Sequence, residues 1–150
     1  ECMLKEKEII AIAQRIIRAN KAPIKIKFLS YNKFKVEAKK SPMVKQVLKE
    51  GNACYDLNVP SLFSHKKDTI YFNKKMLTKL VNGESILTQR MFIKAITYHE
   101  LSHFMNKTRM KDNTVAAAML SEDRAEKQFK KSYPKLAALG KKIASKYGDN

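Results

Sequence analysis

The chain has 150 residues, of which 44% are hydrophobic, and contains only four glycines and four prolines. This length and composition predict one globular domain with a hydrophobic core and exclude a low-complexity chain. The formal net charge is +17, because 31 Lys and Arg residues outnumber 14 Asp and Glu residues. Such a charge indicates either a nucleic acid or anionic surface as partner, or a lysine-rich solvated surface. The scattered positions of the lysines favour the solvated surface.

The two cysteines, Cys2 and Cys54, form neither a ligand cluster nor a disulfide framework. This usage favours a reducing, cytoplasmic setting. Cys54 is interpreted as a small core residue rather than as a zinc-binding thiolate. The most apolar stretch of the N-terminal part, residues 9–17, is interrupted by Gln14 and Arg15 and is far shorter than the roughly 20 residues of a membrane span. We therefore expect no transmembrane segment.

The first third of the chain predicts a helix followed by strands. Residues 3–20 carry isoleucines at helical spacing and predict an amphipathic helix. Residues 24–28 alternate apolar and basic side chains and predict a half-buried strand. Neither period dominates between residues 30 and 50, where we expect a short strand and then a short helix or loop. Two further strands are expected at 52–57 and 69–73.

The rest of the chain predicts consecutive helices, at residues 74–81, 85–106, 113–131 and 134–147. Asn82-Gly83 is a stop signal that ends the first of them. Asp112 or Asn113 caps the third, and Pro134 opens the last. A helix, a few strands and then successive helices predict an α+β fold, with a small mixed sheet of three to four strands packed against the helices.

The helix expected at 85–106 contains a metal-binding pattern, because residues 99–103 are His-Glu-Leu-Ser-His. Two residues four apart lie on the same face of a helix, so the imidazoles of His99 and His103 can reach one Zn²⁺. Glu100, turned to the side, would face a metal-bound water as general base. The pattern predicts a catalytic zinc site.

A zinc site needs a third protein ligand, and the chain has only three histidines. No histidine follows His103, so the choices are His65 upstream or a carboxylate downstream. The helix at 113–131 has an apolar stripe with Glu122 in its middle and Glu126 one turn further on. An unpaired buried carboxylate costs several kcal/mol, so a cation is expected beside these side chains.

We therefore predict that His99, His103 and Glu122 are the metal ligands. Glu126 would accept a hydrogen bond from a ligand histidine, as carboxylates around zinc sites commonly do. The competing interpretation is that both glutamates lie at the edge of the stripe and extend to lysines.

With these residues the chain resembles the gluzincin metallopeptidases, in particular the soluble minigluzincins and the catalytic domains of CAAX-prenyl-type membrane metallopeptidases. The His-Glu-x-x-His pattern followed by Glu-Asp-Arg-Ala-Glu at 122–126 is similar to their His-Glu-x-x-His and Glu-x-x-x-Asp pair. The resemblance covers roughly residues 52–143 and implies a zincin-like fold, so that residues 1–150 would form a single minimal metallopeptidase domain.

The chain departs from that family at two positions. Glu126 stands where the family has Asp, and Tyr133 stands where it has His. Residues 122–129 are also similar to a second group, the phage- and stress-related proteases whose pattern ends Glu-x-Glu-Ala-Asn-x-Phe, except that Phe129 lies one position late.

The motif and the resemblance together predict a zinc endopeptidase with Glu100 as general base. Tyr133 is the predicted donor to the developing oxyanion, with Tyr98 and Arg124 as further choices. The strand at residues 70–73 is expected to be an edge strand that binds a peptide substrate as an added strand.

Two alternatives to a freely active peptidase remain open. One is a basic nucleic-acid-associated factor, in which the zinc site is secondary or acts on proteins bound to nucleic acid. The other is a latent enzyme, a zymogen in which the basic C-terminal helix and the tail around Asp149 cover the cleft.

Overall fold

The computed structural model of the protein describes residues 3–41, 45, 49, 59–107 and 115–148, with the side chains at 106–107, 115–122, 144 and 146–148 left out. The described elements are, in chain order, α1 (Glu6–Ala19), β1 (Lys25–Leu29), α2 (Tyr31–Ala38), β2 (Ser61–Ser64), β3 (Thr69–Asn73), α4 (Lys74–Val81), α5 (Ile86–Lys107), α6 (Val115–Ser132) and α7 (Pro134–Gly148). The α+β class and a small mixed sheet are thus confirmed.

Some predictions fall outside the described residues. They are the strand at 52–57, the helix cap at Asp112 or Asn113, the two cysteines Cys2 and Cys54, the tail residue Asp149 and the side chain of Glu122, whose backbone belongs to α6.

The described strands form one mixed sheet in the order β1-β3-β2. β1 runs parallel to β3, and β2 runs antiparallel to it. Ile70 in β3 is opposite Ile26 in β1 and Phe63 in β2. The prediction that residues 70–73 form an edge strand is therefore wrong, because β3 is hydrogen-bonded on both sides. Within the described sheet, β2 is an edge strand instead.

The segment after residue 30 is helical, so the short strand expected there is wrong. Phe34 and Ala38 lie four residues apart on α2 and are buried against Tyr71 of β3. Only two core residues in an eight-residue helix leave too little pattern for a helical period to be recognised.

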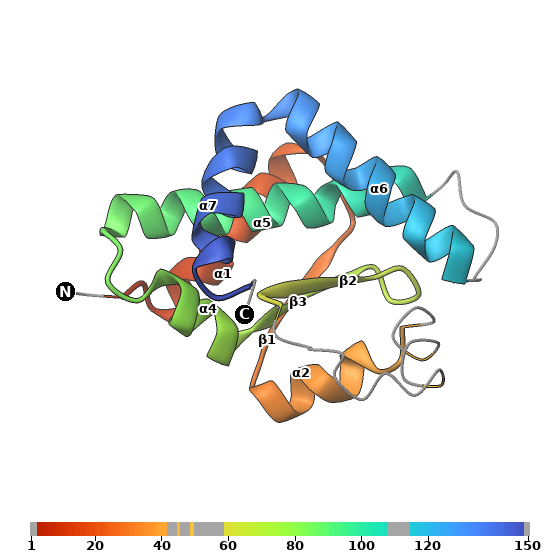
Figure 1. Cartoon of the computed structure of the whole chain (residues 1–150), viewed down its shortest axis with the longest axis horizontal. Coiled ribbons are helices and arrows are strands. Elements are labelled where there is room, and N and C mark those ends of the chain that lie inside the picture. Colours follow the sequence, from red (N-terminus) through yellow and green to blue (C-terminus); the bar gives the residue numbers. More distant parts are fainter. Residues whose placement is uncertain (1–2, 42–44, 46–48, 50–58, 108–114, 149–150) are drawn as a thin grey trace.

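The helices cover both faces of the sheet. In Figure 1, α2 lies below the strands, while α5, with α1 behind it, runs above them. The alternation of β3 explains this arrangement, because Tyr71 packs toward α2 whereas Ile70 and Phe72 join the main core on the other face. The predicted stripe of α1 is buried in full, with Ile9, Ile12, Ala13, Ile16 and Ile17 on it.

The ends of α4 and α7 agree with their sequence signals. The Asn73 side chain accepts a hydrogen bond from the Met76 backbone N–H at 3.3 Å and so caps α4. Gly83, just beyond that helix, has φ of 84°, a conformation that glycine adopts readily. Pro134 opens α7 as predicted.

No helix in the described part of the chain combines the length and the apolar character needed to cross a membrane.

Phe72→Ala should lower the free energy of unfolding by about 3–5 kcal/mol, because the ring is fully buried and its removal leaves a cavity. Denaturant titration followed by circular dichroism measures this loss. Leu87→Ala is the control: Leu87 is 69% exposed, and its truncation should change stability by less than about 0.5 kcal/mol. Equal losses in the two variants would contradict the placement of Phe72 in the core.

Candidate metal centre

The apolar face of α5 leads directly to the two histidines. Phe92 and Ile96 are 1% and 8% exposed and pack in the main core. His99 and His103 continue this face at helical spacing, and His103 is 6% exposed. The shared face that the spacing predicted is thus buried at Phe92, Ile96 and His103 and half-buried at His99. The motif is thereby held on a helix that packs against α1, α6, α7 and β2.

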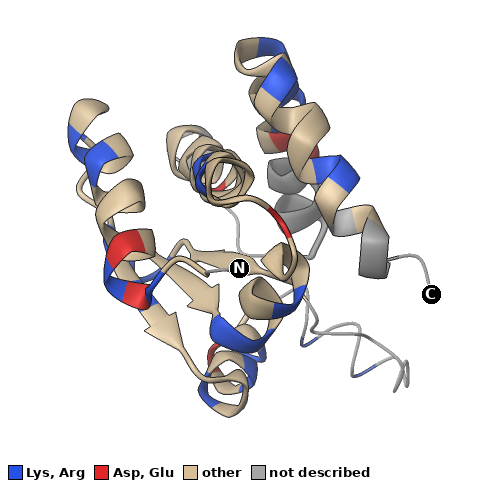
Figure 2. Ribbon diagram, turned by 90° about the vertical axis from the view of Figure 1, so that its left-hand side faces the viewer, with Lys and Arg blue, Asp and Glu red and all other residues tan. Residues whose placement is uncertain are grey.

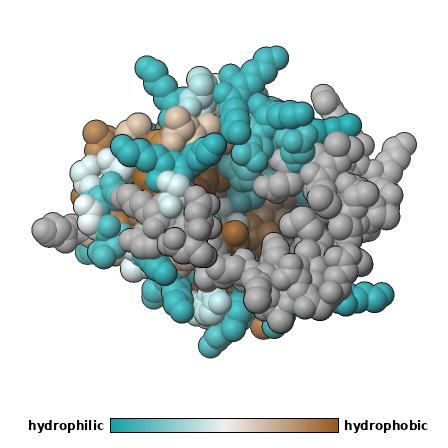
Figure 3. All heavy atoms as spheres, in the orientation of Figure 1, coloured by the Kyte–Doolittle hydropathy of each residue, from teal (hydrophilic) through white to brown (hydrophobic). Residues whose placement is uncertain are grey.

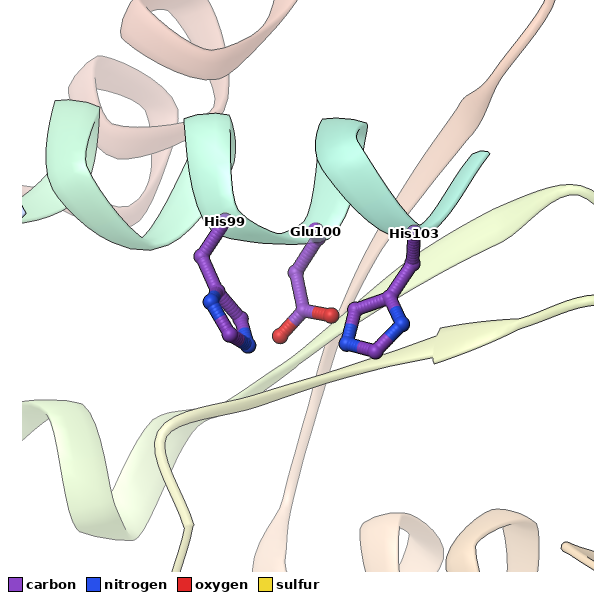
Figure 4. Close-up of side chains that lie close together, drawn as sticks. All are labelled: His99, Glu100 and His103. Atoms are coloured by element: carbon purple, nitrogen blue, oxygen red, sulfur yellow. The ribbon is translucent and has the colours of Figure 1, made fainter. Parts of the chain in front are cut away.

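His99, Glu100 and His103 form a compact group of metal-ligand atoms, all within 4.8 Å of one another. Figure 4 shows the three side chains on the same side of α5, with the Glu100 carboxylate between the two rings. The ring centroids of His99 and His103 are 5.1 Å apart. Imidazoles bound to one tetrahedral zinc at about 2.0–2.1 Å have centroids roughly 5 Å apart, so the spacing fits such an ion. Two imidazoles and a carboxylate are also ligands that zinc commonly takes.

Glu100 is buried, 4% exposed, and its carboxylate has a protein partner. The Ser61 hydroxyl of β2 donates a hydrogen bond of 2.5 Å to Glu100 Oε2. Sequence reasoning missed Ser61. The only available signal was strand alternation, and this identifies one face of β2 without identifying what lies opposite.

The face of β2 that carries Ser61 contacts the motif at further points. The Phe63 ring lies 6.2 Å from the Phe104 ring of α5, edge to face. His65 follows the strand, and its ring lies 6.0 Å from that of His103. Residues two apart on a strand face the same side, so alternate residues of this segment line the motif. Among the described residues, the compact group of ligand atoms does not include His65.

The prediction that Glu126 accepts a hydrogen bond from a ligand histidine placed this residue on the apolar stripe of α6, and that placement is wrong. Its carboxylate lies on the exposed side of α6 and forms an ion pair of 3.3 Å with Lys130. The buried face of this part of α6 consists of Ala125 and Phe129. Glu126 follows Ala125 by one residue, which turns it by about 100° away from the core. For Glu126 the competing interpretation, an extended carboxylate paired with lysine, is confirmed.

Tyr133 lies in an aromatic cluster beside the motif. Its ring stacks on that of Tyr98 with centroids 4.0 Å apart, and it lies 6.2 Å from the Phe129 ring. Phe129 in turn contacts the His99 ring at 6.0 Å. Burial raises the pKa of the Tyr98 phenol, and the neighbouring Tyr133 adds to this rise. The Tyr98 hydroxyl therefore keeps its proton at neutral pH. Arg124, the other donor considered, is exposed on α6.

A cavity of about 270 Å³ lies apart from this group. It is bounded by the N-terminal segment, β1, α4 and α5, and Leu4, Phe28 and Leu77 are among the residues that line it. None of the three residues of the metal-ligand group borders it.

The fold and the site define an α+β protein with a candidate His-Glu-His metal centre on α5. Comparison of the chain with protein-family models, with curated proteins and with solved structures finds no match. The functional argument therefore rests on the residues and their arrangement.

Proposed function

We propose that the protein is a zinc-dependent endopeptidase of the gluzincin type, with His99 and His103 as ligands of the metal. The observation that carries this proposal is the compact group of two imidazoles and one carboxylate on the same side of α5, in which Glu100 and His103 are buried and His99 is half-buried. Glu122 is the proposed third ligand, from its place on the apolar stripe of the helix that packs on α5. Bound zinc would polarise a scissile carbonyl and acidify a water molecule.

Glu100 is the proposed general base. A carboxylate between the two ligand histidines can accept a proton from water and pass it to the leaving amine. Burial favours this role, because low solvent access strengthens the interaction of the carboxylate with a nearby cation. The Tyr98 and Tyr133 phenols are the proposed donors to the oxyanion, and a protonated Tyr98 suits this task.

β2 replaces β3 as the proposed substrate-binding strand. It is an edge of the described sheet, and it lies directly beside the motif through Ser61 and Phe63. An extended peptide pairing with such an edge would place its backbone along the strand next to Glu100. Protein or peptide is therefore the proposed substrate class.

The basic charge by itself does not favour the nucleic-acid alternative. Figure 2 shows Lys and Arg on helices at several sides of the molecule rather than on one. In Figure 3 hydrophilic side chains project along the upper rim, where Figure 1 places α6 and α7, and also along the lower edge of the same face. A nucleic-acid site would gather these charges on one face or along one helix.

The proposal is tested by metal titration and cleavage. Protein stripped of metal should bind one zinc ion per chain and cleave fluorescently labelled casein only when zinc is restored. A chelator should abolish cleavage, and added zinc should restore it. Full cleavage by the metal-free protein, or no zinc bound at micromolar concentration, would overturn the proposal.

Glu122→Ala should weaken zinc binding at least about hundredfold, because it removes a ligand. Removing a residue that only forms a hydrogen bond to a ligand already lowers metal affinity by about 10–100-fold. Glu126→Ala is the matched control on the same helix: its exposed ion pair with Lys130 should contribute about 0.5 kcal/mol or less, so affinity should be unchanged. Competition with a zinc-binding dye measures both affinities. Unaltered zinc binding by Glu122→Ala would exclude this residue as a ligand.

A further inference from the structure

The contact between Ser61 and Glu100 joins two buried polar groups from segments 39 residues apart. The hydroxyl donates to Glu100 Oε2 at 2.5 Å, and the two residues are 9% and 4% exposed. Hydrogen bonds to an ionised acceptor are shorter and stronger than neutral ones, and this distance lies in the range for a hydroxyl bound to a carboxylate.

The backbone around Ser61 is held in place by the sheet. Ser61 is opposite Phe72 in the antiparallel pairing of β2 and β3. Just before it, Asn73 N–H donates to the Pro60 carbonyl at 2.9 Å, and the Asn73 side-chain amide donates to the Val59 carbonyl at 3.1 Å. Asn73 is fully buried. The backbone of Ser61 is therefore held against the central strand β3, by its own pairing with Phe72 and by the hydrogen bonds that Asn73 makes to the two preceding residues.

A carboxylate held at one oxygen has a restricted orientation. A free glutamate can rotate about its terminal torsion, which has broad minima. The hydrogen bond from Ser61 to Oε2 limits this rotation and leaves Oε1 as the oxygen outside the contact, and the carboxylate lies between the two histidines (Figure 4). A general base acts efficiently only from a defined position relative to the proton it receives.

We propose that Ser61 is a positioning residue that orients the Glu100 carboxylate so that Oε1 serves as the base. This inference rests on the proposed peptidase function. The inference adds a second role for strand β2. Besides binding the substrate, this strand orients the general base Glu100 through Ser61.

The contact is tested without activity by a double-mutant cycle in the metal-free protein. Ser61→Ala should raise the unfolding equilibrium constant about tenfold when Glu100 is present, because a buried carboxylate loses its donor. In the Glu100→Ala background the same change should have little effect, since the partner is already gone. Equal effects in both backgrounds would show that the two residues are not coupled and would overturn the proposal.

The positioning role is tested by kinetics on labelled casein with zinc bound. Ser61→Ala should lower kcat at least tenfold while KM and zinc affinity stay unchanged. Ser61→Cys should behave like alanine, because it keeps the volume but donates weakly, and Ser61→Thr should restore most of kcat. Ser30→Ala is the control, and it should leave kcat unaltered. Ser30 is exposed just before α2, on the other face of the sheet, and its side chain makes no capping hydrogen bond.

The outcomes separate this inference from the function on which it rests. Absence of zinc-dependent cleavage in the unaltered protein overturns the peptidase function and, with it, the role of Ser61. Active wild-type protein with normal kcat in Ser61→Ala and Ser61→Cys overturns the positioning role alone. A fall in kcat in both variants, with rescue by threonine, supports it.

Discussion

Glu100→Gln should remove cleavage and leave zinc affinity unchanged. The amide has nearly the same shape as the carboxylate and still offers an oxygen to the Ser61 hydroxyl, but it accepts no proton from water. Loss of general acid–base catalysis should lower kcat by about 10²–10⁴-fold. Cleavage of labelled casein measures kcat, and dye competition measures the zinc affinity of the same preparation.

Glu126→Gln is the control for this change, because the Glu126 carboxylate is exposed and paired with Lys130 away from the core. It should cleave like the unaltered protein. Two results would contradict the assignment of Glu100. Retention of more than about a tenth of kcat would exclude it as the base. Loss of zinc binding would make it a metal ligand, which its place within 4.8 Å of both histidines' ligand atoms allows.

His103→Ala should abolish tight zinc binding. The ring is 6% exposed and lies 5.1 Å, centroid to centroid, from that of His99. Zinc binding should also stabilise the native protein, by about 2.7 kcal/mol when free zinc is a hundredfold above the dissociation constant. The unfolding temperature of the unaltered protein should therefore rise with added zinc, whereas that of His103→Ala should not. Thermal unfolding with and without zinc measures this difference.

His65→Ala is the comparison that isolates the ligand role, because His65 also contacts His103 but is outside the compact group of ligand atoms. The zinc affinity of His65→Ala should fall less than about tenfold, which is the lower end of the loss expected when a residue that contacts a ligand, but not the metal, is removed. An equal loss in His65→Ala and His103→Ala would instead identify His65 as the third ligand. Unchanged zinc-dependent stabilisation of His103→Ala would exclude His103 from the site.

Elements with a clear hydrophobic period were predictable from the sequence. The isoleucine stripe of α1 and the alternation of β1 both lie where they were expected. The helix ends marked by Gly83 and Pro134 agree too, because turn and cap chemistry acts within a few residues.

The predictions failed where the local hydrophobic pattern is weak, or where contacts with other parts of the chain determine the position of an element or side chain. α2 buries only Phe34 and Ala38, too few to show a period. Glu126 follows Ala125 by a single residue, and the rotation of about 100° between neighbouring helix residues turns its carboxylate from the buried to the exposed side. Whether β3 is central or at an edge depends on its pairing with β1, a strand distant in the sequence, as well as with β2, and its own five residues carry no information about that pairing.

The sequence by itself determined that His99 and His103 share one face of a helix with Glu100 beside them, because four-residue spacing places two side chains on one face of any helix. Only the tertiary structure decided what lies opposite them. The packing of β2 on α5 brings the Ser61 hydroxyl to Glu100 and the His65 ring to His103, from segments far apart in the chain. The packing of a strand on a helix that is distant in the sequence is a non-local property that a linear pattern leaves open, and here it provides the surroundings in which the carboxylate is proposed to act.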